Sequence, residues 1–349
     1  MRLVWIDYLR GILAFFVMVY HYTEWNSIYW PMPFNQIISK IGVPAVSGFY
    51  IISGYSIAYV YFNKNINIKF ISIFLFRRFM RLAPLLWVAI LFSFFMGYQI
   101  LPQKLLLNIS LLFAFIDHDQ YIATGSWSIG NEVVFYFLFP LFMLFKSPLK
   151  SKVWCLVIFA ISFIFAVWAA LDWIPESSNK LVLWSRYIHP ANQFWLFAAG
   201  VIICLFRNCI FTNTKLGIIA VFFSLIFLII QLFDFGDPFS GVDRISSCLL
   251  LVGVVWALGL LSYSLPAFAA RPLHCLGAWS YSIYLLHPAA NYFTNYINMK
   301  FLHTNPAFVA LFLAMPSTIV ISALAFNFIE KPAIMFSKKL MGSLKNVEF

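Results

Sequence analysis

Residues 5–24 read WIDYLRGILAFFVMVYHYTE, an apolar stretch as long as a helix that crosses a bilayer. A cleaved signal peptide would show a cleavage site of small residues, and none precedes Glu24, so we interpret the stretch as a retained span. Comparable apolar stretches lie at about 41–62, 80–98, 131–146, 153–171, 193–206, 215–233, 245–263, 279–297 and 307–329. The sequence therefore predicts an all-α integral membrane protein with about ten transmembrane helices.

The composition supports this fold class. Of the 349 residues, 63% are hydrophobic and only 10% are charged, which excludes a water-soluble enzyme and an intrinsically disordered chain. The aromatic content of 20% suits lipid-facing helices with aromatic belts at both membrane interfaces. The net charge of +11 would suggest a nucleic-acid partner for a soluble protein, but in a chain this apolar it first reports topology. We expect the lipid bilayer as a partner and no nucleic acid.

The basic residues indicate how the chain is oriented. The stretch Leu105 to Ile116 is too short for an ordinary span and runs into a polar segment, so we interpret it as one short re-entrant helix. With a cytoplasmic N-terminus, ten crossings place 17 of the 23 lysines and arginines inside, in line with the positive-inside rule. An eleventh crossing would move Lys331 and the C-terminal lysines outside. Both termini are therefore predicted to be cytoplasmic.

The domain organisation is simple. Because neither an internal repeat nor a long polar stretch is visible, we expect one polytopic membrane domain over 1–335 and a short basic cytoplasmic tail over 336–349. The five cysteines lack close pairs with metal-ligand spacing, so we predict free thiols and no metal site.

Ionisable residues inside spans are candidates for function because burying them in lipid is costly. Arg10 and His21 are eleven residues apart in the first span, which places both side chains on one helix face about 16 Å apart along the axis. Histidine is the side chain best suited to accept and return a proton near neutral pH. The alternative is that Arg10 is an interfacial anchor and His21 an ordinary residue of the opposite interface.

Two further motifs follow in the next spans. Ser53 and Gly54 are small residues in the middle of an apolar helix, where they allow close helix packing or leave room for a ligand. Arg77, Arg78 and Arg81 form a basic cluster that we expect at the end of an inside loop, with Pro84 near the start of the next span. Such a cluster is either a topological anchor or a binding site for a phosphate-bearing ligand.

Polar faces mark two later segments. Ser128, Glu132 and Tyr136 have the i, i+4, i+8 spacing of one helix face, directly after Trp127. A second face holds residues at i, i+4, i+7 and i+11, namely Ser280, Tyr284, His287 and Asn291. A carboxylate and a continuous polar face within spans indicate a lined cavity, although a lone buried histidine is more often structural. After the last span, residues 330–332 predict a helix stop with an ion pair.

Taken in order, these motifs resemble the acyltransferase-3 family of membrane O-acyltransferases, over nearly the whole chain. The similar features are the Arg10 and His21 pair, Ser53-Gly54, Arg78 to Pro84, Trp127 to Glu132, Tyr284 to Pro288 and Glu330-Lys331-Pro332. The segment before Ser53 has Ile-Ile where members often have paired phenylalanines, a small departure. Some members carry a fused external hydrolase-like domain, and we expect the standalone form here.

The resemblance implies that an acyl group, usually acetyl, passes from cytoplasmic acyl-CoA to a hydroxyl of a cell-envelope glycan, such as lipid-linked O-antigen or another polysaccharide. Acetyl-CoA would be the donor co-substrate, and the setting a bacterial inner membrane. We expect catalytic roles for His21, as general base or acyl carrier, and for Arg10 and Glu132. Donor binding is expected of Arg77, Arg78, Arg81 and Ser53, and acceptor binding of Trp127, Ser128, Tyr284 and His287.

Two other classes of function compete with this hypothesis. A secondary transporter or lipid-glycan flippase also uses intramembrane arginine, histidine and glutamate, but usually shows an internal repeat. A membrane scaffold would tolerate replacement of Arg10, His21 and Glu132. The acceptor, its modified hydroxyl, the acyl group and the oligomeric state are left open by the sequence.

Overall fold

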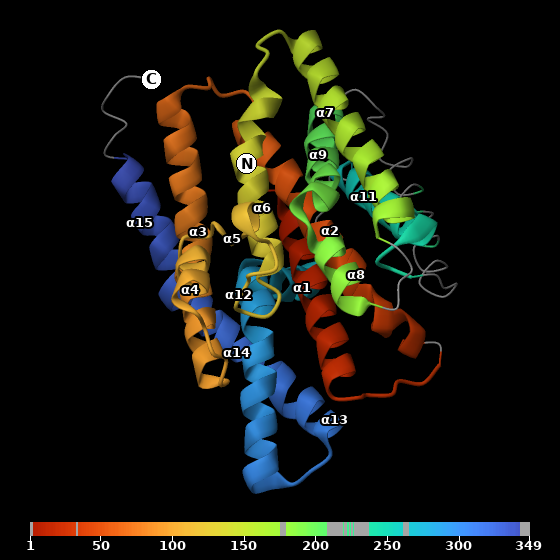
Figure 1. Cartoon of the computed structure of the whole chain (residues 1–349), viewed down its shortest axis with the longest axis vertical. Helices are drawn as coiled ribbons and strands as arrows, with labels where there is room; N and C mark the ends of the chain where they lie inside the picture. The colour runs from red at the N-terminus through yellow and green to blue at the C-terminus, as the bar shows by residue number, and fades with distance from the viewer. Residues whose placement is uncertain are drawn as a thin grey trace. The chain divides into compact units, whose positions relative to one another are not determined.

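A computed structural model describes residues 3–32, 34–174, 179–207, 237–260 and 265–342, together with the isolated residues 219, 222, 224 and 226. Every regular element in these ranges is helical, which confirms the all-α class (Figure 1). The chain forms two compact units that are each discontinuous in sequence. The first unit comprises Met1–Lys64 and Leu141–Ser280, and the second Asn65–Pro140 and Tyr281–Phe349. The boundary between them falls within one helix, α12 (Ala267–Ile297).

The first unit is organised around α2. Its described helices are α1 (Val4–Trp25), α2 (Phe34–Tyr61), α7 (Pro148–Trp168), α8 (Lys180–Ile188), α9 (Pro190–Phe206), α11 (Gly241–Leu260) and the start of α12. Helix α2 packs against α1, α9 and α11, and α7 packs against α9. The buried residues of α2 extend from Gly42 to Ala58, so α2 forms the core of this unit.

Glycines set the closest helix approaches in the first unit. A Cβ at Gly54 would lie 2.0 Å from the carbonyl oxygen of Phe197, and a Cβ at Gly200 would lie 2.0 Å from that of Ile51. Helices α2 and α9 therefore touch backbone to backbone, as small residues allow. On α12, a Cβ at Gly277 would meet the carbonyl oxygen of Asp7 at 2.0 Å.

The second unit is organised around α3. It contains α3 (Ile68–Phe95), α4 (Pro102–Ile109), α5 (Phe113–Ile116), α6 (Trp127–Leu138), the end of α12, α13 (Pro306–Val309), α14 (Met315–Ala325) and α15 (Lys331–Gly342). Helix α3 packs against α6 and α15. Two π-helical turns, Ala310–Ala314 and Phe326–Glu330, join α13, α14 and α15 into one long helix.

Local sequence accounts for several helix ends. The Asn67 side chain accepts a hydrogen bond from the Phe70 N–H at 2.7 Å and caps α3. Helices α7, α9 and α13 begin with Pro148, Pro190 and Pro306, where a proline costs no hydrogen bond. The four described cysteines, Cys155, Cys204, Cys248 and Cys275, are free thiols, as predicted, and Cys209 lies outside the described residues.

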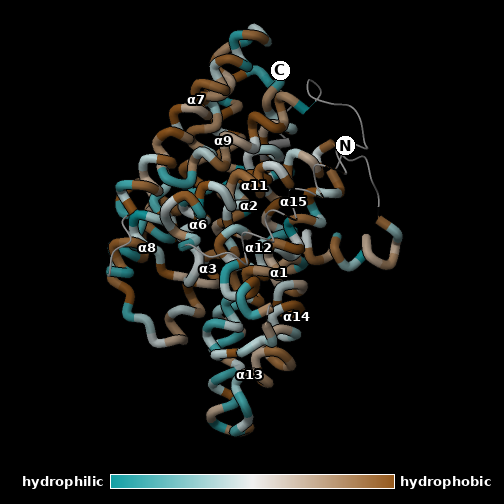
Figure 2. Tube along the Cα trace, turned by 90° about the vertical axis from the view of Figure 1, so that its right-hand side faces the viewer, coloured by the Kyte–Doolittle hydropathy of each residue, from teal (hydrophilic) through white to brown (hydrophobic). Residues whose placement is uncertain are grey.

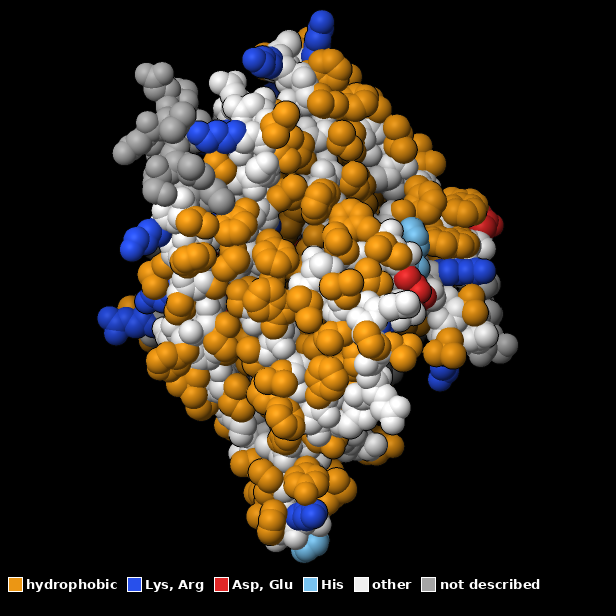
Figure 3. All heavy atoms as spheres, turned by 60° about the vertical axis from the view of Figure 1, so that its left-hand side comes forward, with side chains coloured by type: hydrophobic (Ala, Val, Ile, Leu, Met, Phe, Trp, Pro, Cys, Tyr) orange, Lys and Arg blue, Asp and Glu red, His pale blue; other side chains and the backbone are white. Residues whose placement is uncertain are grey.

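Seven of the described helices are long and apolar enough to cross a membrane. They are Val4–Trp25, Phe34–Tyr61, Ile68–Phe95, Pro148–Trp173, Lys180–Phe206, Gly241–Leu260 and Pro306–Leu340. Figure 2 shows hydrophobic residues along these helices, and Figure 3 shows hydrophobic side chains over most of the face that it draws. Together with the composition, this makes the chain a multi-pass membrane protein.

Three predicted spans differ from these helices. The span predicted at 131–146 is a shorter apolar helix, Trp127–Met143, and that at 279–297 belongs to the longer and less apolar α12. Of the span predicted at 215–233, only the isolated residues 219, 222, 224 and 226 are described. The count of ten crossings, the cytoplasmic termini and the tail boundary at residue 336 stay predictions.

The segment predicted to be one re-entrant helix is broken in two. Helix α4 ends at Ile109 and α5 begins at Phe113, and at about 12 Å α4 is far shorter than a bilayer core. Leu111 between them has φ +62°, a left-handed conformation that is rare outside glycine. The buried Asn108 side chain accepts from the Ile122 N–H and donates to the Gln120 carbonyl, which ties this segment to the loop before α6.

The basic cluster also differs from its predicted position. Helix α3 begins at Ile68, so Arg77, Arg78 and Arg81 lie in its interior and not at the end of a loop. Pro84 is correspondingly a mid-helix residue. The apolar run Phe70 to Phe76 extends the helix before the arginines, and the hydropathy pattern alone could not separate this extension from a loop.

Candidate functional site

His21 lies in the last two turns of α1, in the first unit. Its ring stacks on Trp25 with 4.7 Å between centroids and lies 5.0 Å from the ring of Tyr20. A ring N–H donates to the carbonyl of Val17, one turn earlier. The stacking on Trp25 and the contact with the Val17 carbonyl hold the imidazole ring in one orientation.

Arg10 lies on the same helix, about 16 Å from His21 along the axis. One turn before it, an oxygen of Asp7 lies 3.8 Å from Nε2 of His274 on α12. Arg10 is therefore next to the place where α1 and α12 approach closely, at Gly11 and Gly277, whereas His21 lies near the other end of α1.

Ser53 is buried in α2, within the first unit. Its neighbour Gly54 faces the backbone of α9, so the Ser-Gly segment serves close helix packing, one of the two functions considered for it. Binding of a donor by Ser53 stays a prediction.

In the second unit, a polar cluster connects α6 with α12. The Ser128 hydroxyl donates to the Tyr284 hydroxyl at 2.8 Å, and the Tyr284 hydroxyl donates to the Gly125 carbonyl at 3.0 Å. The Tyr136 hydroxyl donates to a carboxylate oxygen of Glu132 at 2.8 Å. The two predicted polar faces thus meet: Ser128 with Tyr284 across helices, and Glu132 with Tyr136 along one helix.

Two further predicted residues are close in sequence to members of this cluster: Trp127 directly precedes Ser128, and His287 lies three residues after Tyr284. Nδ1 of the buried His287 lies 3.1 Å from the carbonyl oxygen of Ile283, one turn earlier, and its ring centroid is 6.2 Å from that of Tyr284. His287 thus repeats the tethering of His21, with Nε2 as its acceptor nitrogen. Trp127 is buried at the first turn of α6.

The arginines of α3 reach the same cluster from a third helix. The guanidinium carbon of Arg78 lies 5.6 Å from the Tyr136 ring centroid. The Tyr281 hydroxyl donates to the Leu82 carbonyl at 2.6 Å and interacts electrostatically with Arg81 and Glu132. Carboxylate, phenol, hydroxyl and guanidinium groups therefore come together in the second unit, a set suited to a polyhydroxylated or anionic ligand.

Glu330 also belongs to this cluster, a place that its sequence motif did not predict. A helix stop with an ion pair was expected at residues 330–332, but the helix continues from the π turn into α15. Glu330 is buried and accepts a hydrogen bond from the Ser282 hydroxyl, whereas Lys331 is exposed. The helix-stop prediction was wrong: Pro332 lies inside the continuous helix, directly after the π turn Phe326–Glu330, and does not end it.

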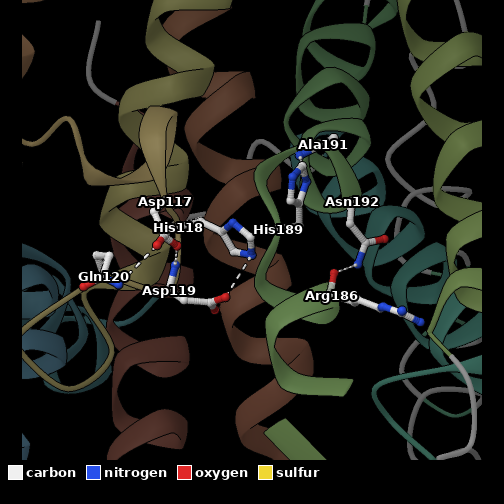
Figure 4. A network of polar contacts seen from close by, with 8 residues as sticks. All are labelled: Asp117, His118, Asp119, Gln120, Arg186, His189, Ala191 and Asn192. Carbon is white, nitrogen blue, oxygen red and sulfur yellow. Dashed lines mark hydrogen bonds and ion pairs between the residues drawn. The ribbon is translucent and has the colours of Figure 1, made fainter. Parts of the chain in front are cut away.

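Arg244 is a second residue whose surroundings the sequence did not predict. It is only 2% exposed in the first unit. Its guanidinium donates to Oδ1 of Asn192 at 2.9 Å and to the Asn192 carbonyl at 3.2 Å, and stacks 5.2 Å from the Tyr187 ring centroid. The Asn192 amide in turn donates to the carbonyls of Arg186 (Figure 4) and Tyr187. This network closes the break between α8 and α9.

One further group could hold a metal ion. The ligand atoms of Asp117, His118 and Asp119 in the second unit all lie within 4.8 Å of one another (Figure 4). They already bind one another and Gln120: the Gln120 amide donates to Asp117 at 3.1 Å, and His118 lies 3.7 Å from Asp119. These contacts suffice to shape the turn after α5.

The predicted site residues thus divide between the two units. Arg10, His21 and Ser53 belong to the first, and the remaining predicted site residues, on α3, α6 and α12, belong to the second. Within the second unit, three helices far apart in sequence contribute to one polar cluster.

Comparison with known proteins identifies a family and one relative. A family model described as an acyltransferase domain matches residues 3–327. The chain is similar to the peptidoglycan O-acetyltransferase OatA of Listeria monocytogenes, with 25% identity over 362 aligned positions that cover 94% of this chain and 55% of that protein. The chain thus spans about half the length of this relative. No solved structure matches.

Proposed function

The chain belongs to the acyltransferase family whose domain covers residues 3–327, and from this premise we propose that it moves an acetyl group from cytoplasmic acetyl-CoA to a hydroxyl of a cell-envelope glycan. The family and the multi-pass helical fold make it a membrane O-acyltransferase. The acetyl donor, the glycan acceptor and the bacterial inner membrane are parts of the proposal.

The tethered His21 is the observation that carries the chemical part of the proposal. Its ring is held by Trp25 and by the Val17 carbonyl, on the same helix as Arg10. A general base must present a lone pair in a fixed direction, and a ring held from two sides supports this role for His21. In the proposed step, His21 removes the proton of the acceptor hydroxyl while the hydroxyl oxygen attacks the thioester carbonyl.

The remaining bond changes complete the acyl transfer. The carbonyl carbon forms an ester bond to the acceptor oxygen, the carbon–sulfur bond breaks, and the CoA thiolate leaves and takes up the proton. Arg10, about 16 Å from His21 along α1, is too far from the reacting carbonyl to stabilise its oxygen and would bind a phosphate of CoA. A route in which His21 first takes the acyl group itself uses the same residue as nucleophile.

Binding of the two substrates follows from side-chain chemistry. Arg77, Arg78 and Arg81 offer guanidinium groups that match the phosphates of CoA, with Ser53 as a further donor contact. Ser128, Tyr284 and His287 would hydrogen-bond the glycan hydroxyls, Trp127 would pack on a sugar face, and Glu132 would bind the sugar or orient His21. The Listeria relative is named for peptidoglycan, so peptidoglycan joins lipid-linked polysaccharide as a candidate acceptor.

The test is ester content of surface glycan in a deletion strain complemented with wild type, His21→Ala or Arg10→Ala. We expect His21→Ala to lower the acetyl ester by about 100-fold or more, because general-base catalysis contributes at least that factor. His303→Asn is the matched control: His303 is exposed, and asparagine tolerates its left-handed backbone.

Membrane abundance of each variant must equal that of wild type for the comparison to hold. A His21→Ala strain with normal ester would refute the role of His21. Unchanged ester in every strain, including the deletion, would refute acetyl transfer to surface glycan and favour transport of a glycan or other substrate.

A further inference from the structure

The second unit contains a cavity of about 240 Å³ between α3, the turn after α4, and α6. Its walls include Leu75 and Phe79 of α3, Leu111 of the turn, and Val133 of α6. Leu111 is fully buried and reaches the cavity from its left-handed backbone conformation. A leucine persists in that conformation only where its surroundings hold it, so this wall is firmly placed.

The volume limits what the cavity can hold. An apolar cavity of about 150 Å³ accepts one benzene ring, so this one has room for a chain on the order of ten carbon atoms. Sites for drug-sized ligands start at about 300 Å³. A nucleotide with its pantetheine arm is therefore too large, whereas a segment of one hydrocarbon chain fits.

Arg78 is the single charged residue among those that line the cavity. Its guanidinium carbon lies 5.5 Å from the Phe74 ring centroid and 5.6 Å from that of Tyr136. Two rings thus hold the cation in place at the edge of an apolar space. A ligand with an anionic group next to a hydrocarbon chain matches this combination.

The surroundings point to the bilayer as the source of the ligand. Phe137 and Leu112, which line the cavity, are 48% and 41% exposed, and the neighbouring Phe115 is 46% exposed. In a membrane protein, exposed apolar side chains of this kind contact lipid chains. The cavity therefore borders the part of the surface where lipid chains are available.

We propose that this cavity binds one acyl chain of an anionic phospholipid, whose phosphate pairs with Arg78. Basic pockets between transmembrane helices on the cytoplasmic side bind anionic headgroups. Arg78 lies in the N-terminal half of α3, the half that the predicted topology places toward the cytoplasm. A guanidinium pairs with phosphate through charge-assisted hydrogen bonds.

The other two arginines of α3 point elsewhere. At about 100° per residue, Arg77 and Arg81 lie on one side of Arg78, and Leu75 and Phe79 lie on the other. The lipid site thus revises the donor site proposed above: of its three arginines, Arg77 and Arg81 remain for the phosphates of CoA, and Arg78 serves the lipid. The lipid site stands whether or not the proposed acetyl transfer is correct.

Native mass spectrometry of the purified full chain tests the proposal. The delipidated protein is titrated with phosphatidylglycerol and with phosphatidylethanolamine of identical chains. We expect one phosphatidylglycerol to bind, with about tenfold preference, because one charge-assisted pair is worth about that factor. Val133→Phe and Leu75→Phe, which fill the cavity from two sides, should abolish this binding, and Arg78→Gln should remove only the preference.

Val134→Phe is the matched control for Val133→Phe. The substitution adds the same bulk on α6, but Val134 does not line the cavity. Equal binding of both lipids by wild type, or unchanged binding by both cavity-filling variants that elute as wild type does, would overturn the proposal. Displacement of the bound lipid by palmitoyl-CoA but not by free phosphate would assign the cavity to an acyl donor and would also overturn it.

Discussion

Arg244 is an arginine removed almost completely from water, and its partners are an amide and an aromatic ring. Burying a cation is costly unless hydrogen bonds and neighbouring charges compensate for it. Asn192 supplies two of these hydrogen bonds, and Tyr187 supplies its ring face. Because the same asparagine also satisfies the carbonyl of Tyr187 at the α8–α9 break, the stability of this break depends on Arg244.

Replacing Arg244 by alanine should destabilise the protein. The change leaves Oδ1 of Asn192 buried without its donor and removes the contact with Tyr187, so we expect a loss of about 2–3 kcal/mol. Thermal unfolding in detergent, followed by fluorescence, should show a midpoint lower by several degrees. Arg271→Ala, which removes an exposed arginine from α12, should leave the midpoint within one degree; an equal effect of both changes would contradict this role.

Single residues also show how far sequence reasoning reaches. The stripe Ser128, Glu132 and Tyr136 was predicted from spacing on one helix, and its members do make polar contacts. Glu330 and Arg244 were missed because their partners, Ser282 and Asn192, are 48 and 52 residues away. Helical periodicity identifies a polar face but contains no information about which distant residue will meet it.

At the scale of elements, the pair α2 and α9 is joined by backbone contact at two glycines. Gly54 on α2 and Gly200 on α9 each face a carbonyl oxygen of the other helix. Close approach of this kind stabilises helix pairs in membranes, where lipid competes equally for apolar side chains. The sequence indicated close packing at Ser53-Gly54, but α9 as its partner could be known only from the structure.

Gly54→Ala should separate these helices. The added Cβ would lie 2.0 Å from the Phe197 carbonyl oxygen, which is backbone and cannot rotate away, so we expect a loss of about 1–3 kcal/mol. Gly259→Ala in α11 is the control, because its Cβ would have ordinary contacts at 3.7 Å with Trp5 and Tyr55. Thermal unfolding should show a lower midpoint for Gly54→Ala only, and the same midpoint for both would refute the contact.

For the whole molecule, the helices are divided between two units that interleave along the chain. In the part of the chain that the structure describes, seven helices satisfy the length and apolarity of a membrane span, and the hydrophobic pattern had located each of them. Boundaries were less accurate, as for α3, because an apolar turn that precedes a charged cluster has no hydropathy signature of its own. The two-unit organisation has no sequence signal, because it depends on contacts between distant segments.

The predicted orientation makes a definite statement about two lysines. A cysteine in place of Lys338 should react with a membrane-impermeant maleimide only after the cell is opened, and a cysteine in place of Lys300 should react in intact cells. The five native cysteines are first replaced by serine, and O-acetylation confirms that the background is functional. Labelling of both positions from the same side would refute the predicted topology.

The π-helical turn Phe326–Glu330 has a consequence for the polar cluster of the second unit. Such a turn holds one residue more than an α-helical turn, so everything after it is rotated by about 100° relative to an uninterrupted helix. Glu330 closes that turn and contacts Ser282. Removing a single residue from this turn would change no functional group. It would nevertheless rotate the Glu330 carboxylate by about 100°, away from Ser282 and toward lipid, so the position of this carboxylate depends on the extra residue of the π turn.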